Sequence, residues 1–380
     1  MQAVQSPIIP VVGALIRQYP GTISLGQGVV SYGPPPESIQ ALSEFLANPD
    51  LNKYQAVQGI PELRTAIAQK LRTENSIPLT SDQSIVVTAG SNMGFMNAIL
   101  VITQPGDEII LQTPYYFNHE MAIAIASCKA VLVPTDAQYQ LQIEAIAAAI
   151  TERTRAIVTI SPNNPTGAVY PRADLQAVNA LCQTHGLYHI SDEAYEAFTY
   201  NGIAHASPAQ FDPDGNHTIT LFSLSKAYGF ASWRIGYMVL PTHLLDAVQK
   251  IQDTILICPP VVSQYAALGA LRAGSSYCTA QLGAIATVRA LVLDALGSLG
   301  DRCIIPQPDG AFYVFLKVQT PLDAMTVVER LIRDYRVAAI PGNTFGMDQG
   351  CYLRIAYGAL QPDTAQEGMA RLVAGLKAIG

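Results

Sequence analysis

The chain has 380 residues, which exceeds the usual size of a single hydrophobic core and predicts two domains. Hydrophobic residues make up 49% and charged residues 13% of the chain, a balance that fits a globular protein with a large interior and excludes general disorder. The formal net charge of -7 is spread without acidic or basic blocks, which argues against nucleic-acid binding and against a polybasic membrane anchor.

The N-terminal part carries a mildly apolar segment at residues 11–16. No basic residue precedes this segment and Arg17 follows it, so we expect no secretory signal. No apolar run approaches the length of a membrane span. The six cysteines lie without any CxxC pair, which predicts reduced thiols in a cytoplasmic protein and no metal site. They are Cys128, Cys182, Cys258, Cys278, Cys303 and Cys351.

From about residue 84, short apolar runs rich in Val and Ile alternate with helical stretches, as in βα units. The expected strands are residues 84–88, 108–112, 130–134, 156–160, 187–191, 218–222 and 235–240. The expected helices between them include residues 92–102, 144–150 and 173–184. Because the strand runs are apolar on both faces, they predict an α/β fold whose large domain holds a mostly parallel seven-stranded sheet between helices. Ligands of such sheets collect at the carboxyl ends of the strands.

The pattern changes after Leu271. A long helical stretch to about Leu299 is followed by expected strands at 312–318, 337–340 and 352–356 and a helix at 324–334. These elements indicate a second, smaller α/β domain, which we expect the N-terminal residues to join. We therefore divide the chain into a large domain, residues 46–272, and a small domain formed by both chain ends, residues 1–45 and 273–380.

The most informative stretch is Ser223-Leu224-Ser225-Lys226, which directly follows an expected strand and precedes Arg234. A lysine amine can form a Schiff base with an aldehyde when burial and neighbouring charge lower its pKa. Ser223 and Arg234 can supply a hydrogen bond and a positive fork to a phosphate. This set suits a phosphorylated aldehyde cofactor. The alternative is an exposed lysine near a surface arginine.

Two further loops follow expected strands. Asp192 comes at the end of one strand, where its carboxylate can pair with a protonated pyridine nitrogen, and Tyr195 lies three positions later on the same loop. Asn164 stands in Ser161-Pro162-Asn163-Asn164-Pro165-Thr166-Gly167 after another strand. The alternatives are an aspartate that caps a helix, a packed tyrosine and an ordinary turn.

Together these motifs resemble the class I and II pyridoxal-phosphate-dependent aminotransferases, which share the aspartate aminotransferase fold. The resemblance runs from Leu25-Gly26-Gln27-Gly28 to Tyr352-Leu353-Arg354-Ile355 and so covers nearly the whole chain. It implies pyridoxal 5′-phosphate as the cofactor, and it implies amino-group transfer from an L-amino acid to a 2-oxo acid by a ping-pong mechanism.

The resemblance also implies roles for single residues. Lys226 corresponds to the Schiff-base lysine, Asp192 to the partner of the pyridine nitrogen, and Tyr195 with Asn164 to the pair at the phenolic oxygen. The implied phosphate ligands are Ser223, Arg234, Ser91 and Asn92, the last two at the start of a helix, where backbone N–H groups favour an anion. Asn92 stands where the family has a small or hydroxyl residue.

Four residues complete the implied site. Tyr116 matches the aromatic side chain that stacks on the ring, and Arg354 matches the arginine that clamps the substrate carboxylate by two hydrogen bonds. Asn164 and Gly28 are implied to line the same substrate site. Tyr54 matches the tyrosine that reaches the phosphate of the neighbouring subunit, which implies a homodimer. The alternatives are a surface salt-bridge arginine and a packed tyrosine.

Two other functions remain open from the sequence. A β-eliminating lyase of the same fold, such as one that cleaves C–S bonds, would share the first chemical steps. A cofactor-binding transcription regulator would also share the fold, but it needs an added DNA-binding domain, for which we expect no room before Leu25.

Overall fold

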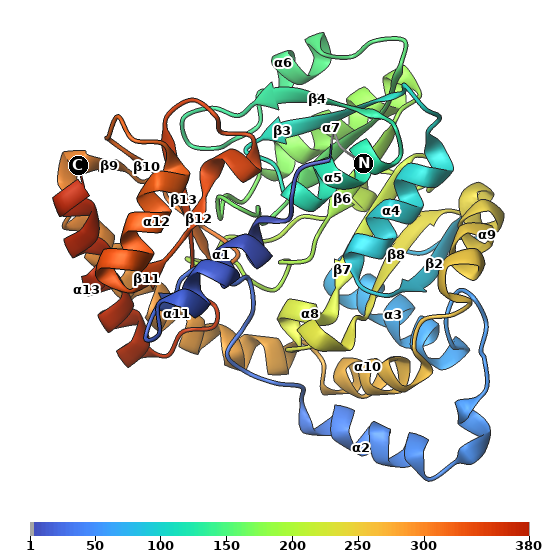
Figure 1. The fold of residues 1–380 in the computed structure, drawn as a ribbon. Coiled ribbons are helices and arrows are strands. Elements are labelled where there is room, and N and C mark those ends of the chain that lie inside the picture. Colours follow the sequence, from blue (N-terminus) through green and yellow to red (C-terminus); the bar gives the residue numbers. More distant parts are fainter. Residues whose placement is uncertain (1–3, 380) are drawn as a thin grey trace.

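The computed structural model describes residues 4–379, and a seven-stranded sheet forms its centre (Figure 1). The strand order is β2-β8-β7-β6-β5-β3-β4, and only β8 runs antiparallel to its neighbours. The expected mostly parallel sheet is therefore confirmed. Its strands are β2 (Gln83–Thr88), β3 (Glu108–Thr113), β4 (Lys129–Pro134), β5 (Thr154–Ile160), β6 (Tyr188–Asp192), β7 (Thr218–Ser223) and β8 (Gly236–Pro241).

Helices cover both faces of this sheet, which explains why its strands are apolar on both sides. Val86 packs with helices on one face while its neighbour Val87 packs on the other, because successive side chains of a strand point in opposite directions. The first face carries α4 (Ser91–Ile102), α5 (Phe117–Ile125) and α9 (Leu245–Leu256). The opposite face carries α3 (Pro61–Glu74), α10 (Val261–Ala273), α6 (Ile143–Ala148) and α7 (Arg172–His185).

The C-terminal part of the chain forms a second, antiparallel sheet, ordered β12-β13-β10-β9. Its strands are β9 (Cys303–Ile304), β10 (Tyr313–Val318), β12 (Ile340–Pro341) and β13 (Cys351–Ala356). The helices beside it are α11 (Ser275–Gly297), α12 (Ala324–Tyr335) and α13 (Pro362–Ile379). Short 3₁₀ helices occupy Pro49–Asn52, Pro208–Phe211, Ala231–Trp233, Thr242–Leu244, Gly300–Arg302 and Gly342–Phe345.

The N-terminal segment divides between the two parts of the molecule. Helix α1 (Ile8–Gln18) packs against α12, and β1 (Ile23–Ser24) pairs in parallel with β11 (Val337–Ala338). Helix α2 (Pro36–Leu46), by contrast, lies along α10 (Figure 1). The division of the chain at residues 46 and 272 stays a prediction.

The long helical stretch expected after Leu271 is confirmed as α11, and α10 ends just before it. Gly274 adopts φ +70°, a conformation that other residues rarely adopt, and it separates α10 from α11. Helix α11 is long and apolar enough by length and composition to cross a membrane, which the sequence analysis did not anticipate. Here α11 packs against α13, and its buried Arg289 donates two hydrogen bonds to the Pro308 carbonyl oxygen.

The strand directions bring several loops to one edge of the large sheet. The carboxyl ends of β2, β5, β6 and β7 meet there, and β7 leads directly into the short helix α8 (Leu224–Ala227). Because β8 runs the opposite way, the residues before it lie at this same edge, and Arg234 is one of them. Segments that are far apart in the chain thus meet at the edge where ligands of such sheets bind.

Candidate active site

A cavity of about 360 Å³ opens at this edge, between the two sheets. Every site residue expected from the sequence except Tyr54 lines it. These are Gly28, Ser91, Asn92, Tyr116, Asn164, Asp192, Tyr195, Ser223, Lys226, Arg234 and Arg354. The cavity therefore joins residues from both sheets and from the N-terminal segment.

The amine of Lys226 reaches into this cavity from α8 and donates a hydrogen bond to the Gly28 carbonyl oxygen. Burial and the positive charges of Arg234 and Arg354 lower the pKa of Lys226 to about 8, although Asp192 acts in the opposite direction. A larger share of this amine than of an ordinary lysine is thus uncharged near neutral pH and able to attack an aldehyde. The alternative of an exposed lysine does not fit this environment.

The carboxylate of Asp192 is held from two sides at the end of β6. Its Oδ1 accepts a hydrogen bond of 3.1 Å from the Ala194 N–H, and its Oδ2 lies 3.0 Å from His119 Nε2. His119 is itself buried and stacks on Phe95 with ring centroids 3.9 Å apart. Sequence reasoning missed His119, although its position three residues after Tyr116, on the same turn of α5, was the signal available.

The phenol of Tyr195 lies in a small network of hydrogen bonds. Its oxygen is 2.7 Å from the Tyr313 hydroxyl, and it accepts a longer bond of 3.4 Å from Asn164 Nδ2. Burial raises the pKa of Tyr195 well above its usual range, so its hydroxyl keeps a proton that it can donate. Tyr313, at the start of β10, was not singled out from the sequence, where it reads only as part of an apolar strand.

The guanidinium of Arg354 is buried, and no acidic side chain among residues 4–379 pairs with it. Nη1 donates to Asn164 Oδ1 at 2.9 Å and Nη2 donates to the Gly26 carbonyl oxygen at 2.7 Å, while the Nε–H has no partner. The rings of Tyr313 and Phe345 lie 4.7 and 5.1 Å from its central carbon. A buried cation that lacks a counter-ion favours an incoming anion. The alternative of a surface salt bridge therefore does not fit Arg354.

A second anion cradle lies at the other end of the cavity. Ser91 begins α4, where backbone N–H groups are free to bind an anion. Arg234 donates to the Ala231 carbonyl oxygen at 3.1 Å and makes two longer bonds, both 3.4 Å, to the Ser225 hydroxyl and the Ala89 carbonyl oxygen. A Cβ placed on Gly90 would collide with the Arg234 guanidinium, so a larger residue there would displace this guanidinium. None of the ion pairs among residues 4–379 involves Arg234.

Three of the expected phosphate and ring residues, Asn92, Tyr116 and Ser223, make hydrogen bonds within the protein that the sequence did not indicate. The Asn92 side chain hydrogen-bonds to Tyr116, whose hydroxyl also accepts from Asn118 Nδ2 at 2.8 Å. The Ser223 hydroxyl accepts from the Ser225 N–H at 3.1 Å and so caps α8. Ser225, which lines the cavity beside Lys226, is a hydroxyl that the sequence analysis gave no role.

Tyr54 lies apart from the cavity. Its side chain is 79% exposed, and it lines a separate surface pocket with Cys258, Pro259 and Val262. Nothing within one chain holds the Tyr54 hydroxyl near the residues described above.

Comparison with known proteins agrees with this geometry. The family model described as aminotransferase class I and II matches residues 20–372. An aromatic aminotransferase, ISS1, from Arabidopsis thaliana is 32% identical over 98% of this chain and 94% of its own length. An aspartate/prephenate aminotransferase from Thermus thermophilus is 35% identical over 87% of this chain and 86% of its own. The solved structure of a Thermus thermophilus aspartate aminotransferase with maleate superposes with a TM-score of 0.91 at 32% identity, covering 98% of both chains.

Proposed function

Because the chain belongs to the class I and II aminotransferases and is an enzyme that moves amino groups from amino acids to 2-oxo acids, we propose that Lys226 carries pyridoxal 5′-phosphate. We also propose that the preferred amino donors of this enzyme have uncharged side chains. One observation carries this proposal. A single cavity holds one amine of lowered pKa, Lys226, together with two guanidinium groups, Arg234 and Arg354, that have no acidic partner.

The cavity has the donor set that pyridoxal 5′-phosphate requires. The phosphate would bind at Arg234, Ser225 and the N-terminus of α4, and the ring nitrogen would face Asp192. Tyr195 and Asn164 would hydrogen-bond to the phenolic oxygen, with Tyr116 against the ring. Two observations favour a phosphate there. Arg234 makes no ion pair among the described residues, and Gly90 has no side chain that would displace its guanidinium.

Each of the protein's side chains in the cavity would have a separate role in the reaction. Arg354 would hold the substrate carboxylate with two hydrogen bonds and so orient the Cα–H bond. Lys226 Nζ would act as the base that removes the Cα proton and then, once protonated, as the acid that delivers it to the cofactor's aldehyde-derived carbon. The bound cofactor supplies a ring that takes up the charge left at Cα. Asp192, whose Oδ2 lies 3.0 Å from His119 Nε2, would pair with the ring nitrogen.

Within one chain, the described residues offer the substrate side chain no free cation. The cations among the described residues that line the cavity are Lys226, Arg234 and Arg354, each of which has a role above, and Pro7, Ile9 and Phe117 add apolar surface. A distal carboxylate would therefore lose its water without gaining a partner, whereas an apolar or aromatic side chain would gain buried area. The named relatives include aspartate and aromatic aminotransferases, so the family alone leaves this choice open.

A panel of donors tests this proposal. With pyruvate as acceptor, phenylalanine, tyrosine, leucine and methionine should give kcat/KM values at least about tenfold above those of aspartate and glutamate, which is the effect of a buried carboxylate left without a partner. A preference for aspartate would contradict the proposed substrate class and leave the aminotransferase activity intact. Acceptor-independent release of pyruvate and ammonia would instead favour the β-eliminating lyase, which the named relatives do not favour.

The exposed position of Tyr54 supports a homodimer in which each subunit completes the other's site. Val262, which lines the same pocket as Tyr54, is also more than a third exposed, as are Ile255 and Ile257, which precede that pocket's Cys258 in the chain. Burying apolar surface of this kind between subunits lowers the free energy. The six cysteines are free thiols, which supports a reducing compartment such as the cytoplasm.

A further inference from the structure

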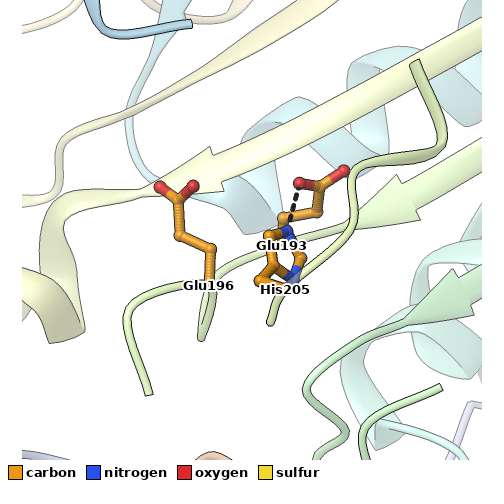
Figure 2. A group of neighbouring side chains, drawn as sticks. All are labelled: Glu193, Glu196 and His205. Carbon is orange, nitrogen blue, oxygen red and sulfur yellow. Dashed lines mark hydrogen bonds and ion pairs between the residues drawn. The ribbon is translucent and has the colours of Figure 1, made fainter. Parts of the chain in front are cut away.

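The turn of residues 192–196, which we call the acidic turn, presents different side chains to its two sides. Asp192 and Tyr195 line the active-site cavity. Glu193 and Glu196 are absent from that lining, and their side chains gather instead with His205 (Figure 2). The groups proposed to face the cofactor therefore belong to a turn whose other side chains lie in an ionic cluster.

Glu193 fastens the acidic turn to a separate segment of the chain. Its Oε1 accepts hydrogen bonds from the Ser191 and Ser207 hydroxyls at 3.0 and 2.7 Å, and its Oε2 lies 2.7 Å from His205 Nε2 (Figure 2). The Glu193 N–H donates to the Leu221 carbonyl oxygen on β7 at 2.8 Å. Because the carboxylate is fully buried, any partner that it loses cannot be replaced freely by water.

Glu196 adds a second attachment. Its carboxylate lies 2.7 Å from Lys70 Nζ and accepts a hydrogen bond from Asn75 Nδ2, both from the region of α3. The ligand atoms of Glu193, Glu196 and His205 lie within 4.8 Å of one another, as they would around a metal ion. Lys70 and His205 already supply the positive charge, however, so the contacts indicate an internal ion-pair network.

We propose that Glu193 and His205 are positioning residues whose ion pair holds the acidic turn, and through it Asp192 and Tyr195, in the orientation that retains the cofactor. This role rests on the proposed function of Asp192 and Tyr195. Asp192 is the direct chain neighbour of Glu193, and Tyr195 follows two residues later, so a change in the direction of Glu193 moves both groups.

Electrostatics indicate how this ion pair responds to pH. Burial disfavours the charged form of His205, but the hydrogen bond and charge of Glu193 outweigh burial and raise the pKa of His205. Burial also raises the pKa of Glu193, against the effect of His205. The two groups therefore share a proton, and the pair loses this proton only when the pH rises through the raised pKa of His205. The titratable and charged groups that face His205 are Glu193, Glu196, Lys70, Glu74, Tyr228 and Cys278.

Cofactor release from the loaded enzyme tests the proposal. Glu193→Gln and His205→Gln should each release pyridoxal 5′-phosphate at least about tenfold faster than the wild type, as expected when a buried charged hydrogen bond is broken. His217→Gln is the matched control. His217 and Asp212 form a buried pair of the same kind, with Nδ1 and Oδ1 3.3 Å apart, before the amino end of β7 and so at the opposite edge of the sheet.

The control should lower the melting temperature of the enzyme with and without cofactor by the same amount and leave the release rate unchanged. In Glu193→Gln, the pH at which half of the cofactor is lost should move down, because His205 loses the carboxylate that raises its pKa while burial still lowers it. A merely structural role would not move this pH. His217→Gln should keep the wild-type value.

Unchanged release rates in both charge variants would overturn the positioning role, as would an equal acceleration in His217→Gln. Should the charge variants fail to fold, Ser207→Ala removes one hydrogen bond from Glu193 and leaves its charge. Release about threefold faster in this variant supports the proposal, and an unchanged rate overturns it. Wild-type enzyme that binds no cofactor would contradict the proposed function instead.

Discussion

At the residue scale, the central feature is the placement of one amine between two cations. Lys226 lies near Arg234 and Arg354, and the burial of its amine together with these two positive charges makes the protonated lysine costly. The same two arginines are proposed to bind the cofactor phosphate and the substrate carboxylate. The charges that hold the anions therefore also prepare the amine for attack.

This arrangement predicts the pH dependence of cofactor capture. Only the neutral amine attacks an aldehyde, so the rate at which apoprotein takes up pyridoxal 5′-phosphate should rise with pH around a midpoint of about 8. Arg354→Gln removes a neighbouring positive charge and should move the midpoint up. Stopped-flow absorbance measures both. A midpoint near that of a free lysine in the wild type would contradict the environment described for Lys226.

Arg354 predicts a separation between substrate and cofactor binding. Arg354→Lys keeps the charge but loses the two-pronged hydrogen bond, so kcat/KM for amino acids should fall by about 100-fold with the cofactor still bound. Amines that lack a carboxylate serve as the control, because their slow reaction does not use this contact and should change little. Loss of cofactor in the variant would show that Arg354 has another role.

Most of the residues that meet in the cavity could be chosen from the sequence, because each stands directly after a strand or within a motif of the family. Tyr313 and His119 could not, since an aromatic residue within a strand and a lone histidine in a helix are ordinary core residues. Their importance arises from the contacts with Tyr195 and Asp192. These contacts depend on the packing of distant segments.

At the scale of elements, the start of α4 and the residues before β8 together form the anion cradle. Val and Ile runs predicted the strands of the large sheet to within two residues of their starts, whereas the two-residue strands β1 and β9 were not predicted. The reversed direction of β8, which brings Arg234 to the edge where Lys226 lies, cannot be deduced from strand patterns alone.

A pair of glycines tests the anion cradle. Gly90 and Gly106 both adopt positive φ, +83° and +89°, but a Cβ on Gly90 would meet the Arg234 guanidinium while a Cβ on Gly106 would meet nothing within 4 Å. Both alanine variants should lose about 1 kcal/mol of stability from backbone strain. Only Gly90→Ala should weaken cofactor binding, as titration of apoprotein would show. Equal cofactor affinities in the two variants would contradict the cradle.

At the scale of the whole molecule, the proposed site would need a residue from a second chain. Tyr54 lies outside the cavity, and only the family resemblance indicated that it serves another subunit. Neither the sequence pattern nor a single folded chain distinguishes such a residue from an exposed surface tyrosine, because its proposed partner is absent from both.

The dimer predicts paired effects on assembly and on the site. Ile255→Asp places a charge on the exposed apolar surface near Tyr54 and should convert dimers to monomers that retain the cofactor poorly. Leu132→Asp on the edge strand β4 is the control, since Leu132 is similarly exposed at 47% against 55% for Ile255. Sedimentation velocity gives the assembly state. A wild-type monomer that is fully active would contradict the shared site.

The identity of the modified lysine tests the account most directly. Purified enzyme is reduced with borohydride, which makes the link between amine and cofactor permanent, then digested and analysed by mass spectrometry. We predict that the added mass of the cofactor lies on the peptide containing Lys226. A cofactor attached to any other lysine, or to none, would contradict the account.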